Sequence, residues 1–314
     1  MIDHEIEIHD IPALTEGQSA LLDMHSLLNV LNVLVGELII IGYELTGDPQ
    51  HLAPALSLCK DIQSTLTNRA TTLDHVARVP EHGRSILDCI AQAAAAHPEA
   101  ADTTAHATSL GNIRSVLEIL GIRAQEILSR TRAPEAWLSM PVAYLQSDLR
   151  AVFQAIEKNS HGRYRILYNL AAKELTDYYV NFHLTAIDGQ CVRLPMVFKD
   201  VMRDLLANAR KFTPPGGTIN AGLLETPELL SFSVEDTGRG IPDDELETVV
   251  HFGHRARNTT DVHGLGGGFG LTKAFLVTKQ FGGRFRIASK PDVGTRIRID
   301  LPRPAHLPRL APPA

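Results

Sequence analysis

Residues 201–217, VMRDLLANARKFTPPGG, contain the stretch that decides the fold of this chain. On a helix, Asp204 and Asn208 are four residues apart and share one face. A carboxylate and an amide placed together are hard oxygen ligands of the kind that hold Mg²⁺ and its waters against a phosphate. Lys211 adds a positive charge about one turn further on. Taken alone, the stretch is equally typical of any helix with one polar face before a Pro-Pro-Gly-Gly turn.

A second stretch, VEDTGRGIP at residues 234–242, combines a strand end with a glycine turn. The strand delivers Asp236 into a turn in which Gly238 and Gly240 permit positive φ and a close approach of backbone. A buried carboxylate there can accept a hydrogen bond from an exocyclic amine such as that of adenine. The same spacing also occurs in many ordinary loops, so it becomes informative only beside its neighbours.

A third stretch, HGLGGGFGLTKAF at residues 263–275, places five glycines directly before a helical run. A glycine-rich loop at a helix N-terminus favours phosphate, because free N–H groups and the helix dipole both attract an anion. The stretch lacks the GxxxxGK[ST] pattern of a Walker A loop. It does not follow a strand in a βαβ unit either, which disfavours a dinucleotide-binding fold.

In this order and spacing, the three stretches resemble the ATPase domain shared by histidine kinases, gyrase B, Hsp90 and MutL, the GHKL or Bergerat fold. The resemblance covers residues 160–301 and implies an α/β sandwich. LLANARKFTPPGG resembles the N box, VEDTGRGIP the G1 box, HFGHRAR a variant F box, GLGGGFGL the G2 box and DVGTRIRIDLP the final strand. The wording of the N box, NA-basic-FTP, is closest to that of histidine kinases.

The resemblance implies ATP and Mg²⁺ as cofactors and assigns a role to each matching residue. Asn208 would hold Mg²⁺, and Asp204 would assist a water or hydroxyl near the γ-phosphate. Lys211 would contact phosphate, Phe212 would pack on adenine, and Asp236 would accept from the adenine amine. The supporting positions are Thr295, acting through water, and the loop-shaping glycines Gly238, Gly240, Gly266, Gly268 and Gly270. Residues 251–265 would form a mobile lid, whose Arg255 and Arg257 either reach phosphate or are simply exposed.

The first half of the chain is predicted to be an antiparallel helical bundle. Apolar residues follow a three-four spacing from Leu21 to Leu45. Further helices are expected over 49–78, 84–96, 110–127 and 143–159, with breaks at 47–49 and 79–83 and a connection at 132–141. Strand-like alternation begins near residue 163. We therefore predict an α+β protein with a helical bundle at 1–159, an ATP-binding domain at 160–302 and a proline-rich disordered tail at 303–314.

The stretch DMHSLLNVLNVL, residues 23–34, contains the candidate phosphoacceptor His25. HSLLNVL resembles the H box of histidine kinases, and Asn29 shares the helix face of His25, where it could orient a water. His25 would lie at a half-exposed flank of the bundle. Ser26 replaces the usual acidic residue and Val30 the usual proline. This predicts either slower autophosphorylation or help from another acid, for which Asp23 and Glu37 are candidates. The alternative is an inert surface histidine.

Composition and charge exclude several classes of protein. The formal net charge of −6 and the pI of about 6.2 show no basic excess, so we expect no nucleic-acid partner. Three scattered cysteines favour reduced thiols and a cytoplasmic location. The first ten residues lack the layout of a signal peptide. The most apolar segment, 33–45, is shorter than the roughly 20 residues of a membrane span, so none is expected.

The leading hypothesis is a soluble sensor histidine kinase, likewise taken from the resemblance. Mg-ATP would phosphorylate His25, and an aspartate on a separate response-regulator protein would receive the phosphoryl group. A homodimer through the N-terminal helices is expected, because the apolar face at 38–41 must be covered. The helices at 84–159 exceed the family pattern, and could complete a single-chain four-helix bundle, as in mitochondrial ketoacid dehydrogenase kinases, or form a sensory insertion.

Two other functions fit the same sequence. One is a serine/threonine kinase or anti-sigma-like regulator on the same fold. The other is a nucleotide-gated interaction module that transfers no phosphoryl group. The remaining histidines of the helical half show no credible metal spacing and are expected on the surface: His51, His75, His82, His97 and His106.

Overall fold

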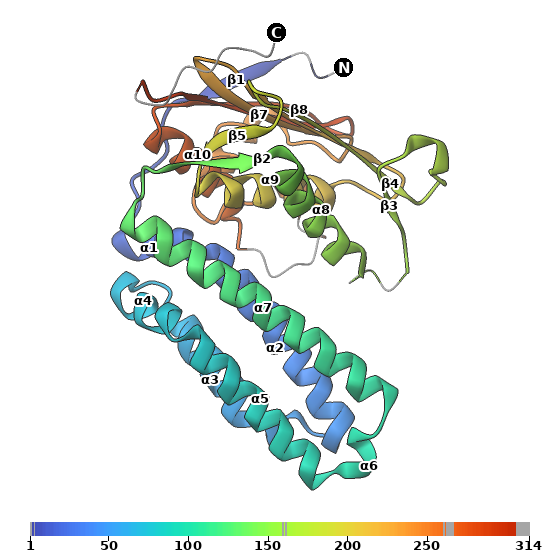
Figure 1. The fold of residues 1–314 in the computed structure, drawn as a ribbon. Coiled ribbons are helices and arrows are strands. Elements are labelled where there is room, and N and C mark those ends of the chain that lie inside the picture. The colour runs from blue at the N-terminus through green and yellow to red at the C-terminus, as the bar shows by residue number, and fades with distance from the viewer. Residues whose placement is uncertain are drawn as a thin grey trace. The chain divides into compact units, whose positions relative to one another are not determined.

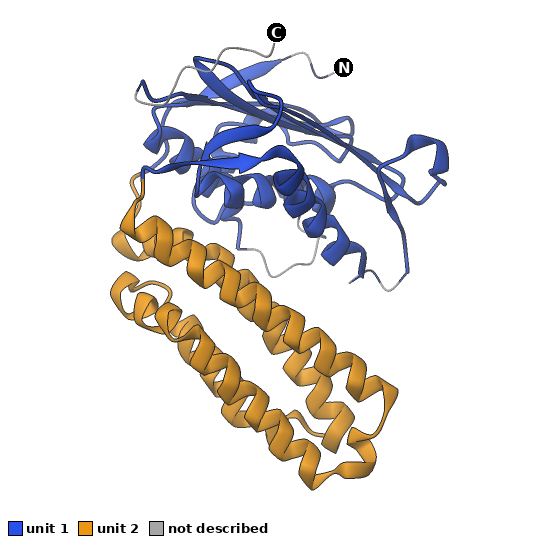
Figure 2. Cartoon of the chain, viewed as in Figure 1, with its two compact units in different colours: residues 1–12, 135–314 blue, residues 13–134 orange. Residues whose placement is uncertain are grey.

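The computed structural model describes residue 2, residues 4–158, residue 160, residues 162–259, residue 261 and residues 267–305. By its contacts the chain divides into a helical unit, Ala13–Pro134, and a sheet unit made of Met1–Pro12 and Glu135–Ala314 (Figure 2). The chain therefore passes between the two units twice. An α+β protein with a helical N-terminal half and a C-terminal mixed sheet is confirmed.

The helical unit is an antiparallel bundle in which α2 (His25–Thr46) and α7 (Thr104–Arg132) lie side by side (Figure 1). Helices α3 (Ala53–Ser64) and α5 (Val79–Ala96) pack against them and each other. Three shorter helices and one 3₁₀ turn complete the unit: α1 (Glu16–Asp23), η1 (Pro49–Leu52), α4 (Arg69–Ala77) and α6 (Pro98–Ala101).

The core of this unit lies along α2. Its buried residues recur every three or four positions, as one face of a helix requires: Leu27, Leu31, Leu34, Leu38, Ile41 and Leu45. Gly42 allows the next segment to fold back closely, because a Cβ atom there would lie 2.7 Å from Cα of Pro49. Gly47, with φ of +71°, ends the helix in a left-handed conformation.

The prediction of one continuous helix over 49–78 is wrong. Helix α3 ends at Ser64, and α4 begins at Arg69. The side chain of Asn68 caps the N-terminus of α4 by accepting from Thr71 N. The break expected at 79–83 is also wrong, since α5 begins at Val79. Pro80 lies in the first turn, where its missing N–H removes no helical hydrogen bond.

Helix α2 also corrects the expectation about membrane-spanning length. Its 22 residues make it long and apolar enough to cross a bilayer by length and composition alone. One such helix near the N-terminus is weak evidence for a span, because the core helix of a water-soluble bundle meets the same criteria.

The sheet unit is built on seven strands in the order β1-β8-β9-β7-β6-β4-β3, with a separate two-stranded sheet of β2 and β5. Pairing is antiparallel except between β3 and β4 and between β4 and β6. The strands are β1 (Glu5–Ile8), β2 (Trp137–Pro141), β3 (Ile166–Leu167), β4 (Tyr178–Thr185), β5 (Cys191–Pro195), β6 (Thr218–Glu225), β7 (Leu229–Asp236), β8 (Arg284–Lys290) and β9 (Gly294–Pro302).

Three helices cover one face of the large sheet (Figure 1): α8 (Val142–Lys158), α9 (Phe198–Phe212) and α10 (Gly270–Gln280). Side chains from β7 alternate between this buried face and the other face, as in a sheet covered on one side. Phe232 of β7 and Phe198 of α9 pack edge to face in the resulting core, with ring centroids 5.9 Å apart.

Contacts place the boundary between the units differently from the expected 159/160. Strand β1 pairs with β8, β2 pairs with β5, and α8 packs on α9 and β4, so residues 135–158 and the first twelve residues belong to the sheet unit. The tail expected to be disordered, 303–314, lies outside the described residues beyond residue 305.

Candidate functional site

The polar face of α9 presents the pair that the sequence singles out. Asp204 and Asn208 lie one turn apart on the helix, whose opposite side is buried through Met202, Leu206 and Ala209. The start of α10 packs directly against this pair. A Cβ atom on Gly270 would lie 2.8 Å from Nδ2 of Asn208 and 3.7 Å from Cβ of Asp204. Only a glycine at this position leaves the amide of Asn208 undisturbed.

Asp236 ends β7 opposite Thr295 of β9 in the sheet register. Its side chain is 8% exposed, and Gly238 N donates to Oδ1 at 2.8 Å. Burial raises the pKa of Asp236 to about 6, although hydrogen bonds from the Gly238 and Thr295 backbone and the Thr213 side chain oppose the shift. The carboxylate is therefore fixed in place and poised to change charge near neutral pH.

The two positions after Asp236 that are occupied by glycine each require it, for different steric reasons. A Cβ on Gly238 would lie 2.6 Å from both Asp236 Oδ1 and the carbonyl oxygen of Phe212. Gly240 has φ of +66°, and a Cβ there would meet the carbonyl of Lys290 at 2.1 Å. Arg239 N donates to Phe212 O at 3.2 Å. These contacts join the turn after β7 to the end of α9 and to the β8–β9 turn.

The glycine-rich stretch is described from residue 267 onward, so Gly266 lies outside the described residues. Gly268 has φ of +76°, and a Cβ there would meet His254 O at 2.7 Å. The Phe252 and Phe269 rings pack together with centroids 4.8 Å apart. Gly268 and Gly270 thus bring the N-terminus of α10 against the Asp204–Asn208 face, and a helix N-terminus attracts anions.

Lys211 and Phe212 lie at the C-terminal end of α9. The ammonium of Lys211 lies 5.4 Å from the ring centroid of Phe212, within range of a cation–π contact. Burial, and then the charge of Arg255, lower the pKa of Lys211. A partly buried cation next to a second cation favours an anionic ligand, which would offset both the burial of the charge and the repulsion between the two cations.

Arg257 in the expected lid already has carboxylate partners. It contacts Asp244 at 2.7 Å and Glu245 at 3.0 Å. Arg255 is exposed and its guanidinium lies 3.5 Å from Thr259 O. Residue 260 and residues 262–265 of the expected lid lie outside the described residues.

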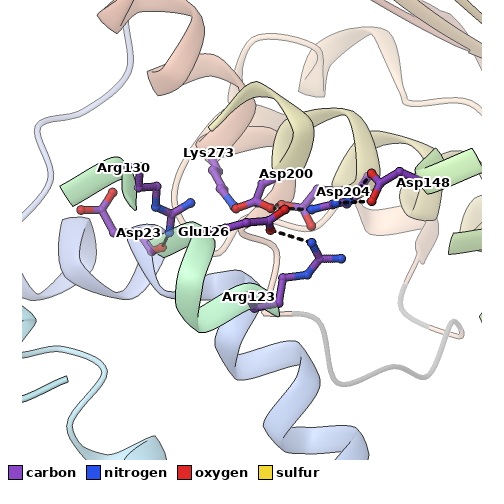
Figure 3. A network of polar contacts seen from close by, with 9 residues as sticks. Asp23, Arg123, Glu126, Arg130, Asp148, Asp200, Asp204 and Lys273 are labelled. Carbon is purple, nitrogen blue, oxygen red and sulfur yellow. Dashed lines mark hydrogen bonds and ion pairs between the residues drawn. The ribbon is translucent and has the colours of Figure 1, made fainter. Parts of the chain in front are cut away.

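Lys273 was not singled out by the sequence, yet it contacts the site. The ammonium of this α10 lysine lies 3.4 Å from Asp200 Oδ2 and 3.5 Å from Asp204 Oδ2, and the side chain is only 4% exposed (Figure 3). No local signal marks it, because the two contacts span about seventy residues of chain. The lysine follows Gly270 by three residues, so both lie on the α10 face that meets α9.

Thr213 and Tyr178 were also missed and hold the end of α9. Tyr178 Oη donates to Thr213 O at 3.0 Å, and Thr213 Oγ1 donates to Ala209 O at 2.7 Å. Arg210 stacks on the ring of Tyr178, with its guanidinium carbon 5.2 Å from the centroid. The Phe-Thr-Pro motif at 212–214 was the sequence feature that could have pointed to Thr213.

In the helical unit, His25 is the first residue of α2 and follows the short break at Met24. It is 6% exposed, which corrects the half-exposed position expected for it. Asn29 lies one turn on along the same helix and is partly buried. The backbone carbonyl of Asp23 accepts from Arg130 of α7, and its carboxylate contacts Arg69 of α4 at 3.2 Å. Two guanidinium groups therefore lie close to the start of α2.

Only some of the histidines expected on the surface of this unit lie there. His82 and His106 are buried, and His82 Nε2 lies 3.3 Å from Nδ1 of His75. Burial, and then the charge of His75, lower the pKa of His82. These two rings pack at the corner between α4 and α5, with centroids 5.4 Å apart.

The donor set fits a magnesium ion that arrives with a nucleotide. No group of three or more His, Cys, Asp or Glu side chains that could hold a metal occurs among the described residues. Asn208 offers one hard oxygen, and Mg²⁺ in such sites takes its other ligands from phosphates and water. Asp236, Gly238 and the α10 N-terminus supply the complementary positions for an amine donor and for phosphate.

Residues 195–305 match the protein family described as the histidine kinase-, DNA gyrase B-, and HSP90-like ATPase. The adaptive-response sensory kinase SasA of Synechococcus elongatus is 36% identical over 109 residues, which is 34% of this chain and 28% of that protein. SasA of a Synechocystis species is 32% identical over 154 residues, covering 45% of this chain and 39% of that protein.

Solved structures of similar proteins include the mycobacterial sensor histidine kinase MprB. It is 20% identical, with 53% of this chain and 97% of that chain covered and a TM-score of 0.38. The chain spans 28 to 39% of the length of the curated relatives it matches. The family match lies wholly within the sheet unit.

Proposed function

We propose that this chain, a histidine kinase-like protein with a GHKL ATPase domain, binds Mg-ATP and uses it to phosphorylate His25. The phosphoryl group then passes to an aspartate of a separate response-regulator protein. The observation that carries the proposal is the packing of Gly270 against Asn208 and Asp204, with Asp236 and Gly238 held against the far end of the same helix. It brings together an amine acceptor, a magnesium ligand and a phosphate-binding helix N-terminus.

Each residue of the site has a distinct part in binding. Asp236 accepts a hydrogen bond from the adenine amine, and Thr295 supports it from β9. Phe212 packs on the base. Asn208 would hold Mg²⁺, which would help to neutralise the negative charge of the phosphates during transfer. The remaining groups, Lys211 and the N–H groups around Gly268, bind the phosphates.

The transfer step forms one bond and breaks one. A ring nitrogen of His25 attacks the γ-phosphorus in line, while the bond from that phosphorus to the β,γ-bridging oxygen breaks and ADP leaves. Asp204 would assist a water or hydroxyl near the γ-phosphate, and Asn29 would orient a water near the imidazole. Because His25 is 6% exposed, the step requires its ring to become accessible. Arg69 and Arg130, near the start of α2, stabilise the charge of phosphohistidine.

Incubation of the full chain with γ-³²P-ATP tests the assignment of His25. We expect label that is acid-labile and alkali-stable, lost in His25→Gln and retained in the control His97→Gln. Label that survives His25→Gln at wild-type level would overturn the assignment. Acid-stable label on a partner protein would instead identify a serine/threonine kinase or an anti-sigma-like regulator.

A nucleotide-gated module without phosphoryl transfer is the second candidate. The buried position of His25 and the presence of Ser26, whose hydroxyl is buried where the family has an acid, favour it. Its signature is tight ATP binding with no phosphoprotein, with or without a response regulator. We place either activity in the cytoplasm.

A homodimer through the helical unit is part of the proposal. The outer surfaces of α2 and α7 expose a set of large apolar side chains: Val33, Ile39, Ile40, Tyr43, Ile119 and Ile122. Leu38 and Ile41 are already buried within the bundle, so only part of the apolar face at 38–41 needs a partner. Light scattering should show a dimer that Ile40→Glu converts to monomer, whereas the control Leu175→Glu, in the sheet unit, leaves it intact. A wild-type monomer would rule the dimer out.

A further inference from the structure

Three polar side chains form a row across neighbouring strands at the proposed base-binding position. Ser289 of β8 is paired in register with Thr295 of β9, and Thr295 is paired with Asp236 of β7. Side chains of directly paired residues lie on the same face of a sheet. Phe232, four residues before Asp236 and on the same side of β7, packs on Phe198 of α9, so the row lies on the helix-covered face.

The hydroxyl of Ser289 makes three hydrogen-bond contacts, each 2.8 Å long. Its Oγ atom accepts from Ile241 N, donates to Gly294 O and contacts Oγ1 of Thr295. The side chain is 5% exposed. Because a serine hydroxyl has one proton and two acceptor positions, these three partners use its full capacity.

The direction of the hydrogen bond between Ser289 and Thr295 follows from this count of protons. A carbonyl oxygen can only accept, so the contact of 2.8 Å between Gly294 O and Ser289 Oγ requires the serine proton. The Ile241 N–H is itself a donor and leaves that proton where it is. The proton between the two hydroxyls therefore comes from Thr295. With its one proton donated to Ser289, Thr295 can only accept from a ligand or a water.

An acceptor-only Thr295 determines what the row can recognise. Ionised Asp236 also only accepts, so the two adjacent residues together present acceptors and no donor. The exocyclic amine of a 6-aminopurine supplies a donor to them, whereas the carbonyl of a 6-oxopurine adds one more acceptor. A water between Asp236 and Thr295 keeps this preference, because it donates both of its protons to them and can then only accept from the base.

We infer that Ser289 is a positioning residue for base recognition, which accepts the Thr295 proton and thereby makes the site select a 6-aminopurine over a 6-oxopurine nucleotide. It acts on the nucleotide through Thr295. The inference rests on the proposed function, since it specifies how the proposed ATP site distinguishes one base from another.

Titration calorimetry of the full chain with the magnesium complexes of ATP and of inosine triphosphate (ITP) tests the inference. ITP carries a 6-oxo group in place of the amine, and at pH 8 Asp236 is ionised. We expect wild type to bind ATP at least about tenfold more tightly than ITP. In Ser289→Ala the Thr295 proton is free to donate toward the base, so the ratio of the two affinities should fall by at least about fivefold. An unchanged ratio in folded Ser289→Ala would overturn the inference.

Two control variants separate selectivity from stability. Ser231→Ala, in the same sheet, removes a hydroxyl that donates to Asp300 and should lower stability without changing the ratio of affinities. Ser289→Thr keeps the hydroxyl and should keep the wild-type ratio, although its added methyl group can cost stability in a buried position. A merely structural Ser289 would instead weaken both nucleotides alike in Ser289→Ala. A ratio as low in Ser289→Thr as in Ser289→Ala would also contradict the inference.

Variants at Thr295 decide the same question if Ser289→Ala does not fold. Thr295→Val has nearly the same shape without the hydroxyl and should lower the ratio, whereas Thr295→Ser should keep it. Where both substitutions are tolerated, adding Ser289→Ala to Thr295→Val should change the ratio no further, because the two residues act on one proton. A wild-type ratio in Thr295→Val would refute the inference.

Failure of the inference and failure of the proposed function give different results. If folded wild type binds neither nucleotide, the ATP site is refuted and the inference falls with it. If wild type binds ATP and ITP equally tightly, or if it prefers ATP by a ratio that no substitution at Ser289 or Thr295 alters, the ATP site stands and the inference alone is refuted.

Discussion

Gly270 and Asn208 pack so closely that any side chain at position 270 would require the terminal amide of Asn208 to shift. A Cβ atom on Gly270 would lie 2.8 Å from Nδ2 of Asn208, closer than side-chain atoms normally approach. The glycine is the first residue of α10, and the asparagine lies on the polar face of α9. The contact joins two stretches that are more than sixty residues apart in the sequence.

Gly270→Ala should therefore displace the Asn208 amide and weaken Mg-ATP binding by on the order of tenfold or more, since small misplacements in such sites are costly. The matched control is Gly111→Ala in α7, where a Cβ would meet nothing within 4 Å. That control should keep nucleotide affinity and raise stability by up to about 1 kcal/mol. Equal affinity in Gly270→Ala and wild type, measured by titration calorimetry, would rule out the contact as a determinant.

Asp236 should make nucleotide binding depend on pH. Its pKa of about 6 means that the ionised acceptor is lost as the pH falls below 6, so affinity should drop by up to about tenfold per pH unit there. In Asp236→Asn, whose side chain does not titrate, affinity should be low and flat from pH 5 to 8. A wild-type affinity that is independent of pH across this range would refute the role of Asp236.

The same pKa predicts a stability effect of defined sign. The folded-state pKa is raised above the ordinary aspartate value, so the ionised side chain costs stability as the pH rises through 6. Asp236→Asn should thus be more stable than wild type at pH 8, by on the order of 2 kcal/mol, and no more stable at pH 4. Denaturant unfolding at the two pH values measures both differences.

Tyr178 should stabilise the C-terminal end of α9, which contributes residues to the site. Its hydroxyl donates to the carbonyl of Thr213 at a buried position. Tyr178→Phe leaves that carbonyl unpaired and should cost about 1–2 kcal/mol of unfolding free energy. The exposed Tyr43 offers the control, since Tyr43→Phe should change stability by less than about 0.5 kcal/mol. Equal losses in both variants would contradict this role.

The His75–His82 contact should make the helical unit sensitive to acid. The pKa of His82 is lowered in the folded state, so this residue binds a proton more readily in the unfolded chain. Its contribution to stability is present above pH 6.5 and is lost as the pH falls below that value. His82→Gln should flatten the decline in melting temperature between pH 7 and 5, whereas His9→Gln, at an exposed position, should leave it unchanged. An unaltered decline in His82→Gln would show that the pair has no such effect.

The sequence predicted the elements whose periodicity is long and uninterrupted, such as α7 and α8. It missed β1, although EIEI alternates as a strand does, because a four-residue strand gains its stability from pairing with β8 at the far end of the chain. It also merged α3 and α4, because the apolar rows of the two helices happen to stay in phase across the break.

The residues of the candidate site could likewise be predicted only where a short stretch of sequence contains the informative pattern. Motif glycines and the Asn208 and Asp236 positions could be picked out because their spacing within short stretches is informative. Lys273 could not be, since a lysine three residues into a helix is ordinary until the fold brings Asp200 and Asp204 to it. The burial of His25 depends likewise on how whole helices pack.

Titration calorimetry of the full chain with Mg-ATP tests the central claim most directly. The account predicts saturable binding of one nucleotide per chain, which Asn208→Ala weakens in the presence of Mg²⁺ and Asp236→Asn weakens with or without it. No detectable binding to the folded wild-type chain, or binding that both substitutions leave unchanged, would contradict it.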